Sequence, residues 1–191
     1  QLFDRISSAS LNSYLENFMK GLTAKVWRTY NASYLFQKEL DKVKADKIAS
    51  IHESERINYL ISVFNQANTA VALLCNHQKN VAGDITKQLE TINDKIKKLQ
   101  KKKNKYKDAS STKHKDAIKK IDAKIKTWKL KKETKNKMKN VSLGTSKNNY
   151  IDPRIIFAFI KKFNIPEEKL FNKKLLKRFE WARNVSKDYR F

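Results

Sequence analysis

The feature that most constrains the fold of this chain is a seam of apolar residues that lie alternately four and three positions apart in a lysine-rich segment. This spacing is a heptad repeat, in which one stripe of each helix packs against a partner helix. The seam is interrupted at Ser110-Ser111-Thr112 and then resumes. Two helical halves of similar length around one break predict an antiparallel coiled-coil hairpin. The seam consists of Ile85, Leu89, Ile92, Ile96, Leu99 and Tyr106, followed by Ile118, Ile121, Ile125 and Trp128.

The remainder of the chain is also expected to be helical. The 191 residues include only three Gly and two Pro, and we find no convincing strand run, so the predicted fold class is all-α. We divide the chain into a first helical part at 1–79, the hairpin at 80–140 and a compact third part at 141–191.

In the first part, apolar periodicity predicts three helices. One runs from a Ser10 cap to about residue 20 and ends at Gly21, and the others cover 22–43 and 54–77. Their apolar faces are expected to pack on something outside this chain.

In the third part, Asp152-Pro153 predicts the start of a strongly apolar helix that continues to about Phe163. A short helix should follow Pro166, and Asn172 can cap a last helix with a buried stripe as far as about Val185. About 50 residues make only a marginal core alone, so this part should dock on the first.

The charge of the chain predicts a polyanionic partner. Lys and Arg number 43 against 19 acidic residues, a net charge of +24, and residues 84–140 alone contain 21 Lys against 7 acids. Nucleic acid is favoured over a membrane, and no membrane span is expected because the apolar run Ile155–Ile160 is far shorter than roughly 20 residues. The hairpin lysines form either a solvated face or an electrostatic arm near DNA. Cys75 is the only cysteine, which fits a reducing compartment.

Tyr150 is the candidate nucleophile. It ends the polar, basic run Gly144-Thr145-Ser146-Lys147-Asn148-Asn149-Tyr150, which we expect to be a loop. A phenol held there can attack a phosphate when cations and backbone N–H groups surround the anion. Taken alone, such a tyrosine is more often an ordinary residue at the edge of a core.

Arg28 and His77 are candidate phosphate ligands. Arg28 offers a planar guanidinium fork and His77 a hydrogen-bond donor, although an isolated Arg is usually a surface residue and an isolated His a packed one. Lys147 and Arg154 would lie near the phosphate or in solvent. The sequence has no histidine and carboxylate cluster at metal-ligand spacing, no glycine-rich phosphate loop and no Ser or Cys nucleophile elbow. With these classes excluded, the residues predict a phosphotransferase that uses no metal, nucleotide or other cofactor.

Three segments in this order resemble the eukaryotic type IB DNA topoisomerases: L-T-A-K-V-W-R-T-Y-N-A-S (22–33), L-L-C-N-H-Q (73–78) and G-T-S-K-N-N-Y-I-D-P-R (144–154). The basic hairpin between His77 and Tyr150 matches as well. The resemblance implies the helical part of the catalytic core shared with tyrosine recombinases at 1–79, a coiled-coil linker at 80–140 and a tyrosine-bearing C-terminal domain at 141–191.

The resemblance also implies a mechanism of nicking, rotation and resealing on double-stranded DNA in the nucleus. Tyr150 would form a 3′-phosphotyrosyl link, Arg28 and His77 would hold the non-bridging oxygens, and no cofactor would be needed. Asn149 would lie where intercalating inhibitors of the family bind. The residues expected to contact DNA are Lys25, Lys147, Asn149 and Arg154.

One departure from the family pattern limits this expectation. Members of the family use a further Arg and a general-acid Lys from a region upstream of the first motif, together with an N-terminal clamp around DNA, and we do not assign the acid to Lys25. We therefore expect a fragment of a monomeric enzyme or one subunit of a split heterodimer, with little activity alone. A tyrosine recombinase remains an alternative, although position 80 is Asn rather than a basic residue. A non-catalytic basic coiled-coil module that binds nucleic acid is another.

Overall fold

The computed structural model describes residues 4–77, 85–106, 112–137 and 142–191, and every regular element in these ranges is a helix. The predicted all-α class is therefore confirmed. In the described part, no helix is long and apolar enough to cross a membrane. The elements are α1 (Ser8–Glu16), α2 (Ala24–Asp41), α3 (Ala45–Ala49), α4 (Glu53–Leu74), α5 (Ile85–Asn104), α6 (Thr112–Lys137), α7 (Leu143–Asn149), α8 (Pro153–Phe163) and α9 (Lys173–Arg178), with short 3₁₀ turns at Glu167–Lys169 and Glu180–Ala182.

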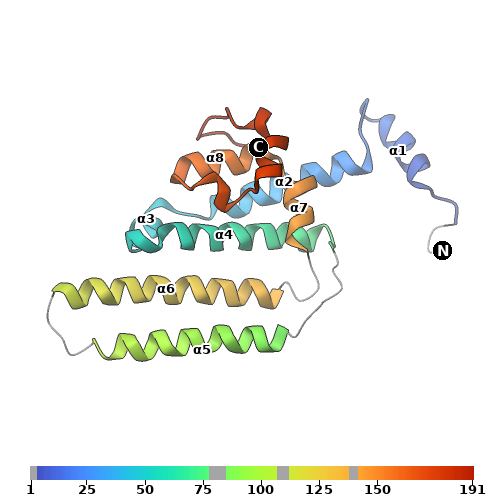
Figure 1. Ribbon diagram of the computed structural model, residues 1–191. Helices are drawn as coiled ribbons and strands as arrows, with labels where there is room; N and C mark the ends of the chain where they lie inside the picture. Colours follow the sequence, from blue (N-terminus) through green and yellow to red (C-terminus); the bar gives the residue numbers. More distant parts are fainter. Residues whose placement is uncertain (1–3, 78–84, 107–111, 138–141) are drawn as a thin grey trace.

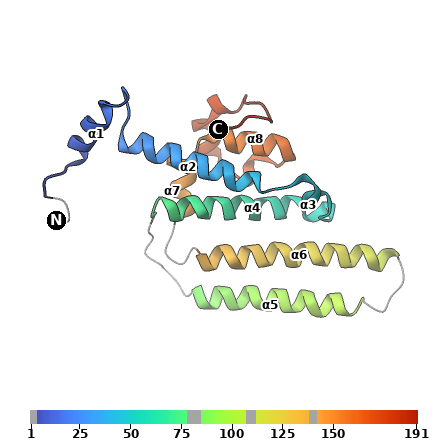
Figure 2. The ribbon, with the colours of Figure 1, turned by 180° about the vertical axis from the view of Figure 1, so that it is seen from behind.

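The helices are stacked in layers, as both ribbon views show (Figures 1 and 2). α5 and α6 lie side by side below α4, α2 lies above α4, and α8 with the rest of the C-terminal part covers α2. α1 extends away from these layers at the end where α2 begins. The short helix α7 crosses this same end and carries the chain from the hairpin into the C-terminal part.

The main core joins the first and third parts of the chain. Phe36 of α2, Phe64 of α4 and Phe159 of α8 form a chain of aromatic contacts, with ring centroids 5.3 Å and 6.2 Å apart. All three side chains are buried. Aromatic pairs of this kind add about 0.5–1.5 kcal/mol beyond the burial of their area. The expected docking of the C-terminal part on the first part is therefore present.

The hairpin has the predicted seam and, in addition, a second contact face. Ile92 and Ile96 of α5 pack with Ile121 and Ile125 of α6, at the heptad positions. The opposite side of α6 lies against α4, where Ala123 packs with Ile51 and Tyr59 and is joined by Val63 and Leu130. α6 is thus sandwiched between α5 and α4. Ser110 and Ser111 of the predicted break lie outside the described residues.

The expectation that the first part packs against something outside the chain is only partly met. α4 is covered by α6 on one side and by the main core on the other. The outer faces of α1 and α2 stay exposed among the described residues, and their exposed aromatic side chains include Tyr14, Trp27, Tyr30 and Tyr34.

Two boundaries at the N-terminal end and one loop were predicted wrongly. α1 is capped by Ser7, because the Ser7 hydroxyl accepts from the Ser10 N–H while the Ser10 side chain accepts from the Ser7 N–H. Ser10 is therefore the third helical residue, and the helix ends at Glu16 rather than near residue 20. The polar run before Tyr150 is the helix α7 and not a loop, since tertiary contacts hold it: Asn68 of α4 donates to the Leu143 carbonyl.

In the C-terminal part, the local signals were mostly correct. The Asp152 carboxylate caps α8 by accepting from the Arg154 N–H at 2.8 Å, and Asn172 caps α9 by accepting from the Leu175 N–H at 2.9 Å. α9 is shorter than predicted, because the chain leaves the α-helix after Arg178 and continues through a 3₁₀ turn. α3 was not predicted.

Candidate active site

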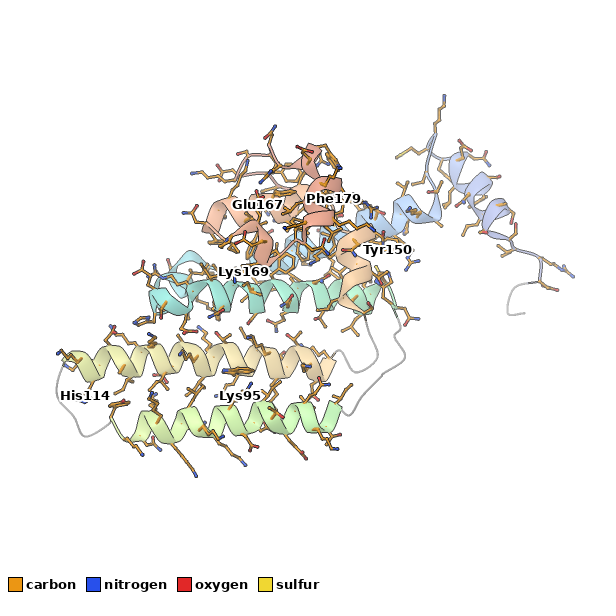
Figure 3. All side chains as sticks on the ribbon, in the orientation of Figure 1. Lys95, His114, Tyr150, Glu167, Lys169 and Phe179 are labelled. Carbon is orange, nitrogen blue, oxygen red and sulfur yellow. The ribbon has the colours of Figure 1, made fainter. Side chains whose placement is uncertain are left out.

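Three side chains predicted to act together come from three separate elements at one end of the molecule. Arg28 lies on the second turn of α2, a helix that begins where the Thr23 hydroxyl accepts from the Val26 N–H. His77 follows the end of α4, and Tyr150 is the C-cap residue that follows α7. In Figure 3, Tyr150 lies at the end of α4 that is remote from the hairpin tip marked by His114.

The position of His77 is set by the way α4 terminates. Asn76 has the left-handed φ of 49°, and Asn is one of the few residues that tolerate this conformation. The N–H groups of Asn76 and His77 then donate to the Leu73 and Ala72 carbonyls, which is the Schellman pattern. The His77 carbonyl in turn accepts from the Ser142 N–H at 2.8 Å, so the histidine is fixed on both sides of its backbone.

Tyr150 is held through its backbone. Its N–H donates to the Ser146 carbonyl at 2.9 Å, and its own carbonyl accepts from the Ser33 hydroxyl at 3.2 Å. The same Ser33 oxygen accepts from the Asp152 N–H at 2.9 Å. Ser33 is fully buried on α2. Its two hydrogen bonds therefore join the segment of Tyr150 to the helix that carries Arg28.

The three functional groups are in direct contact. The Arg28 guanidinium carbon lies 4.7 Å from the centre of the Tyr150 ring, and the rings of His77 and Tyr150 are 5.0 Å apart. Nη2 of Arg28 donates to the Cys75 carbonyl at 2.9 Å and lies 3.4 Å from Nε2 of His77. Among the described residues, no hydrogen bond engages the Tyr150 hydroxyl.

The electrostatics of the site favour a neutral histidine beside a fixed cation. Burial, and secondarily the positive charge of Arg28, hold the pKa of His77 below its usual value of 6.5. Nδ1 of His77 is 2.8 Å from the hydroxyl oxygen of Ser146, whose side chain is fully buried. At neutral pH, the neutral ring of His77 therefore has one N–H group that can donate a hydrogen bond, and the guanidinium of Arg28 beside it is a cation.

The four residues predicted to contact DNA are less closely grouped. The Lys147 ammonium points into the protein and donates to the Leu170 carbonyl at 2.6 Å, and burial lowers its pKa. Arg154 forms a bidentate pair with Asp152. Asn149 and Lys25 are exposed, on α7 and α2. Contact with DNA stays a prediction for all four, and for Lys147 it would require the bond to Leu170 to open.

Two residues of the site were not singled out from the sequence. Ser33 and Ser146 are buried serines whose hydroxyls contact the Tyr150 segment and His77. A serine within a helical pattern carries no local signal for such a role, because its partners lie far away in the sequence. Within the described ranges, no group of three or more His, Cys, Asp or Glu side chains is placed to hold a metal ion.

Comparison with known proteins identifies the family of this chain. The sequence model described as "Eukaryotic DNA topoisomerase I, catalytic core" matches residues 1–110, and that described as "C-terminal topoisomerase domain" matches 122–191. The chain is 39% identical over 195 residues to DNA topoisomerase 1 of Drosophila melanogaster and 39% identical over 188 residues to that of Caenorhabditis elegans. It is 34% identical over 208 residues to the mitochondrial DNA topoisomerase I of Rattus norvegicus.

The all-helical fold and the Arg, His and Tyr constellation thus occur in a chain that belongs to the eukaryotic DNA topoisomerase I family. The alignments with the Drosophila, Caenorhabditis and Rattus proteins cover 100%, 95% and 100% of this chain. They cover 19%, 22% and 34% of the three relatives, so the chain spans about a fifth to a third of their length.

Proposed function

We propose that this chain supplies the nucleophile and two phosphate ligands of a type IB DNA topoisomerase, which relaxes supercoiled DNA by transient single-strand cleavage. The observation that carries the proposal is the contact of Arg28, His77 and Tyr150, which come from three elements and are far apart in the sequence. Membership of the eukaryotic DNA topoisomerase I family supports the same assignment.

The proposed reaction is an exchange of one phosphodiester for another. The Tyr150 phenol oxygen attacks the phosphorus of a DNA phosphodiester and loses its proton. The bond from phosphorus to the 5′-oxygen breaks, and the 5′-oxygen leaves with a proton as a hydroxyl. The DNA strand is then joined to the protein through a 3′-phosphotyrosine. After the free end has rotated, the 5′-hydroxyl reverses the step, so no outside energy source is needed.

Arg28 and His77 act on the charge that develops during this attack. The guanidinium and the imidazole N–H would each donate to a non-bridging oxygen of the pentavalent phosphorus. Donors that are fixed before the reaction avoid the cost of reorganising water, and removal of one such donor typically slows a reaction by about 10²–10³-fold. The backbone bonds that fix His77 on both sides supply this preorganisation.

Double-stranded DNA is the proposed substrate and partner. The net charge of +24 and the lysine-rich hairpin favour a polyanion, and the hairpin would act as a basic arm near the rotating DNA. We place the protein in the nucleus, with mitochondria as the other location suggested by the name of one relative. We further propose that the general acid, a second phosphate-binding Arg and the DNA clamp come from the longer part of the protein that the relatives possess.

A covalent adduct tests this function. The chain is joined to the portion of the Drosophila relative that precedes the matched segment, and the joined protein is incubated with a DNA suicide substrate that cannot be resealed. We expect an adduct that survives denaturation. Tyr150→Phe should abolish it, because the phenol oxygen is lost. Arg28→Lys should slow adduct formation by about 10²–10³-fold, since Lys cannot reproduce the planar fork.

The control variant is Arg178→Lys, a change of the same type at an exposed position of α9. It should form the adduct at the wild-type rate. A Tyr150→Phe protein that still forms the adduct would show that the nucleophile is a different residue. If the wild-type joined protein binds DNA but never forms an adduct, the non-catalytic nucleic-acid-binding module is the better description.

A further inference from the structure

We propose that Ser146 is a positioning residue that fixes the tautomer of His77, so that Nε2 carries the proton and faces the phosphate beside Arg28. The effect that we expect on catalysis rests on the proposed function. Its structural content, the position of one proton on His77, is independent of the reaction.

The first step concerns which atom donates in the contact between Ser146 and His77. Ser146 Oγ and His77 Nδ1 are 2.8 Å apart in a buried contact, and the Ser146 side chain is fully buried. A hydroxyl has one donor and two acceptor sites, and a buried donor without a partner costs more than an unused lone pair. Among the described residues, His77 Nδ1 is the acceptor within reach of the Ser146 hydroxyl. Ser146 therefore donates, and Nδ1 is the unprotonated nitrogen.

The second step concerns the other ring nitrogen. A neutral imidazole with an unprotonated Nδ1 must carry its proton on Nε2. Nε2 lies 3.4 Å from Nη2 of Arg28, which is also a donor. Two donors that face one another across this distance cannot bond to each other, but both can donate to the oxygen of an anion placed between them. The hydroxyl of Ser146 thus prepares a site for the non-bridging oxygen of a phosphodiester.

The third step is what happens when the hydroxyl is absent. In Ser146→Ala, Nδ1 has no donor to accept from, and the alternative tautomer becomes favourable because its Nε2 accepts from Arg28 Nη2. Arg28 and His77 would then bond to each other, and the phosphate would lose a donor from each. Loss of the partner that orients a metal-ligating histidine typically costs about 10- to 100-fold in activity, and we expect a loss of the same order here.

Nitrogen NMR of the side chains tests the proposal directly. In the ¹⁵N-labelled full chain at a pH above 7, the His77 signals should show Nε2 protonated and Nδ1 unprotonated, with His77→Gln used to assign them. Ser146→Ala should move proton population to Nδ1, and Ser146→Thr, which keeps the hydroxyl, should preserve the wild-type tautomer. Ser62→Ala is the matched control, because Ser62 is an equally buried helical serine away from the site, bonded to the Asn58 carbonyl.

Kinetics of the joined protein supply the second readout. Ser146→Ala should slow adduct formation by about 10- to 100-fold while DNA affinity is unchanged, and Ser146→Thr should recover most of the rate. A wild-type His77 with its proton on Nδ1, or a Ser146→Ala protein with an unaltered tautomer, would overturn the proposal. So would a changed tautomer with an unchanged rate. The NMR result is obtained without DNA, so it stands apart from the Tyr150→Phe test of the proposed function.

Discussion

At the scale of single residues, the candidate site places one neutral histidine next to one arginine cation. Burial and the charge of Arg28 both favour the neutral form of His77. A neutral ring has a defined donor, whereas a protonated ring next to Arg28 would add repulsion to a desolvated group. The pKa of His77 is therefore linked to the stability of the whole chain.

This linkage predicts a loss of stability in weak acid. Because the folded-state pKa of His77 lies below its unfolded value of about 6.5, the unfolded chain binds more protons between these two values. The free energy of unfolding should accordingly fall as the pH is lowered below about 6.5 and level off beneath the folded pKa. Urea unfolding of wild type and His77→Gln from pH 8 to pH 5 measures the difference, and equal pH slopes for the two proteins would contradict the prediction.

At the scale of helices, local signals determined some elements and tertiary contacts determined others. The start of α8 could be predicted because Asp152 and Pro153 act within their own helix turn. The helix α7 could not, since Gly144, Thr145 and the Asn residues are weak helix formers and its stability comes from contacts with α4. The same distinction applies to the candidate site: Arg28, His77 and Tyr150 could be proposed from sequence motifs and do lie in contact, but Ser33 and Ser146 bond only to partners distant in the sequence.

The cap of α8 gives a prediction of stability. Asp152 accepts from the Arg154 N–H and pairs with the Arg154 guanidinium, with a shortest distance of 2.6 Å. Asp152→Ala should lower the free energy of unfolding by about 1–2 kcal/mol, mainly through the lost cap. Asp152→Asn keeps a capping oxygen but removes the charge, so it should cost under about 1 kcal/mol. Urea unfolding compares the two, and an Asn variant as unstable as the Ala variant would assign the effect to the ion pair instead.

At the scale of the whole molecule, the hairpin packs along α4, and residues 84–140 contain 21 Lys against 7 acids. The second contact stripe of the hairpin, on α6, includes Ala123 and Leu130, and Thr127 and Thr134 at the adjoining positions are also buried, so the buried positions outside the α5 seam are mostly small or polar. Such a stripe is a weak apolar signal, so the sequence predicted the seam with α5 and missed the seam with α4. The root of the hairpin, where α5 begins and α6 ends, lies at the same end of the molecule as Tyr150 (Figure 3).

If the hairpin follows DNA, its lysines should control the salt dependence of binding. Four exposed lysines of α5 (97, 98, 101 and 102) are replaced by Gln, and the matched control replaces four exposed lysines around α9 (169, 173, 174 and 177). Each phosphate contact contributes about 0.9 to the slope of log affinity against log salt. The hairpin variant should therefore have the flatter slope for duplex DNA, and equal slopes for both variants would mean that the hairpin is only a solvated charged surface.

The central claim is that Tyr150 attacks DNA, and the most direct measurement is the chemical identity of the protein–DNA bond. The trapped adduct of the joined protein is digested with protease and nuclease, and the modified peptide is mapped by mass spectrometry. We predict a nucleotide attached to Tyr150 through its 3′-phosphate, with a free 5′-hydroxyl on the released strand. A nucleotide on any other residue, or one attached through a 5′-phosphate, would contradict the account.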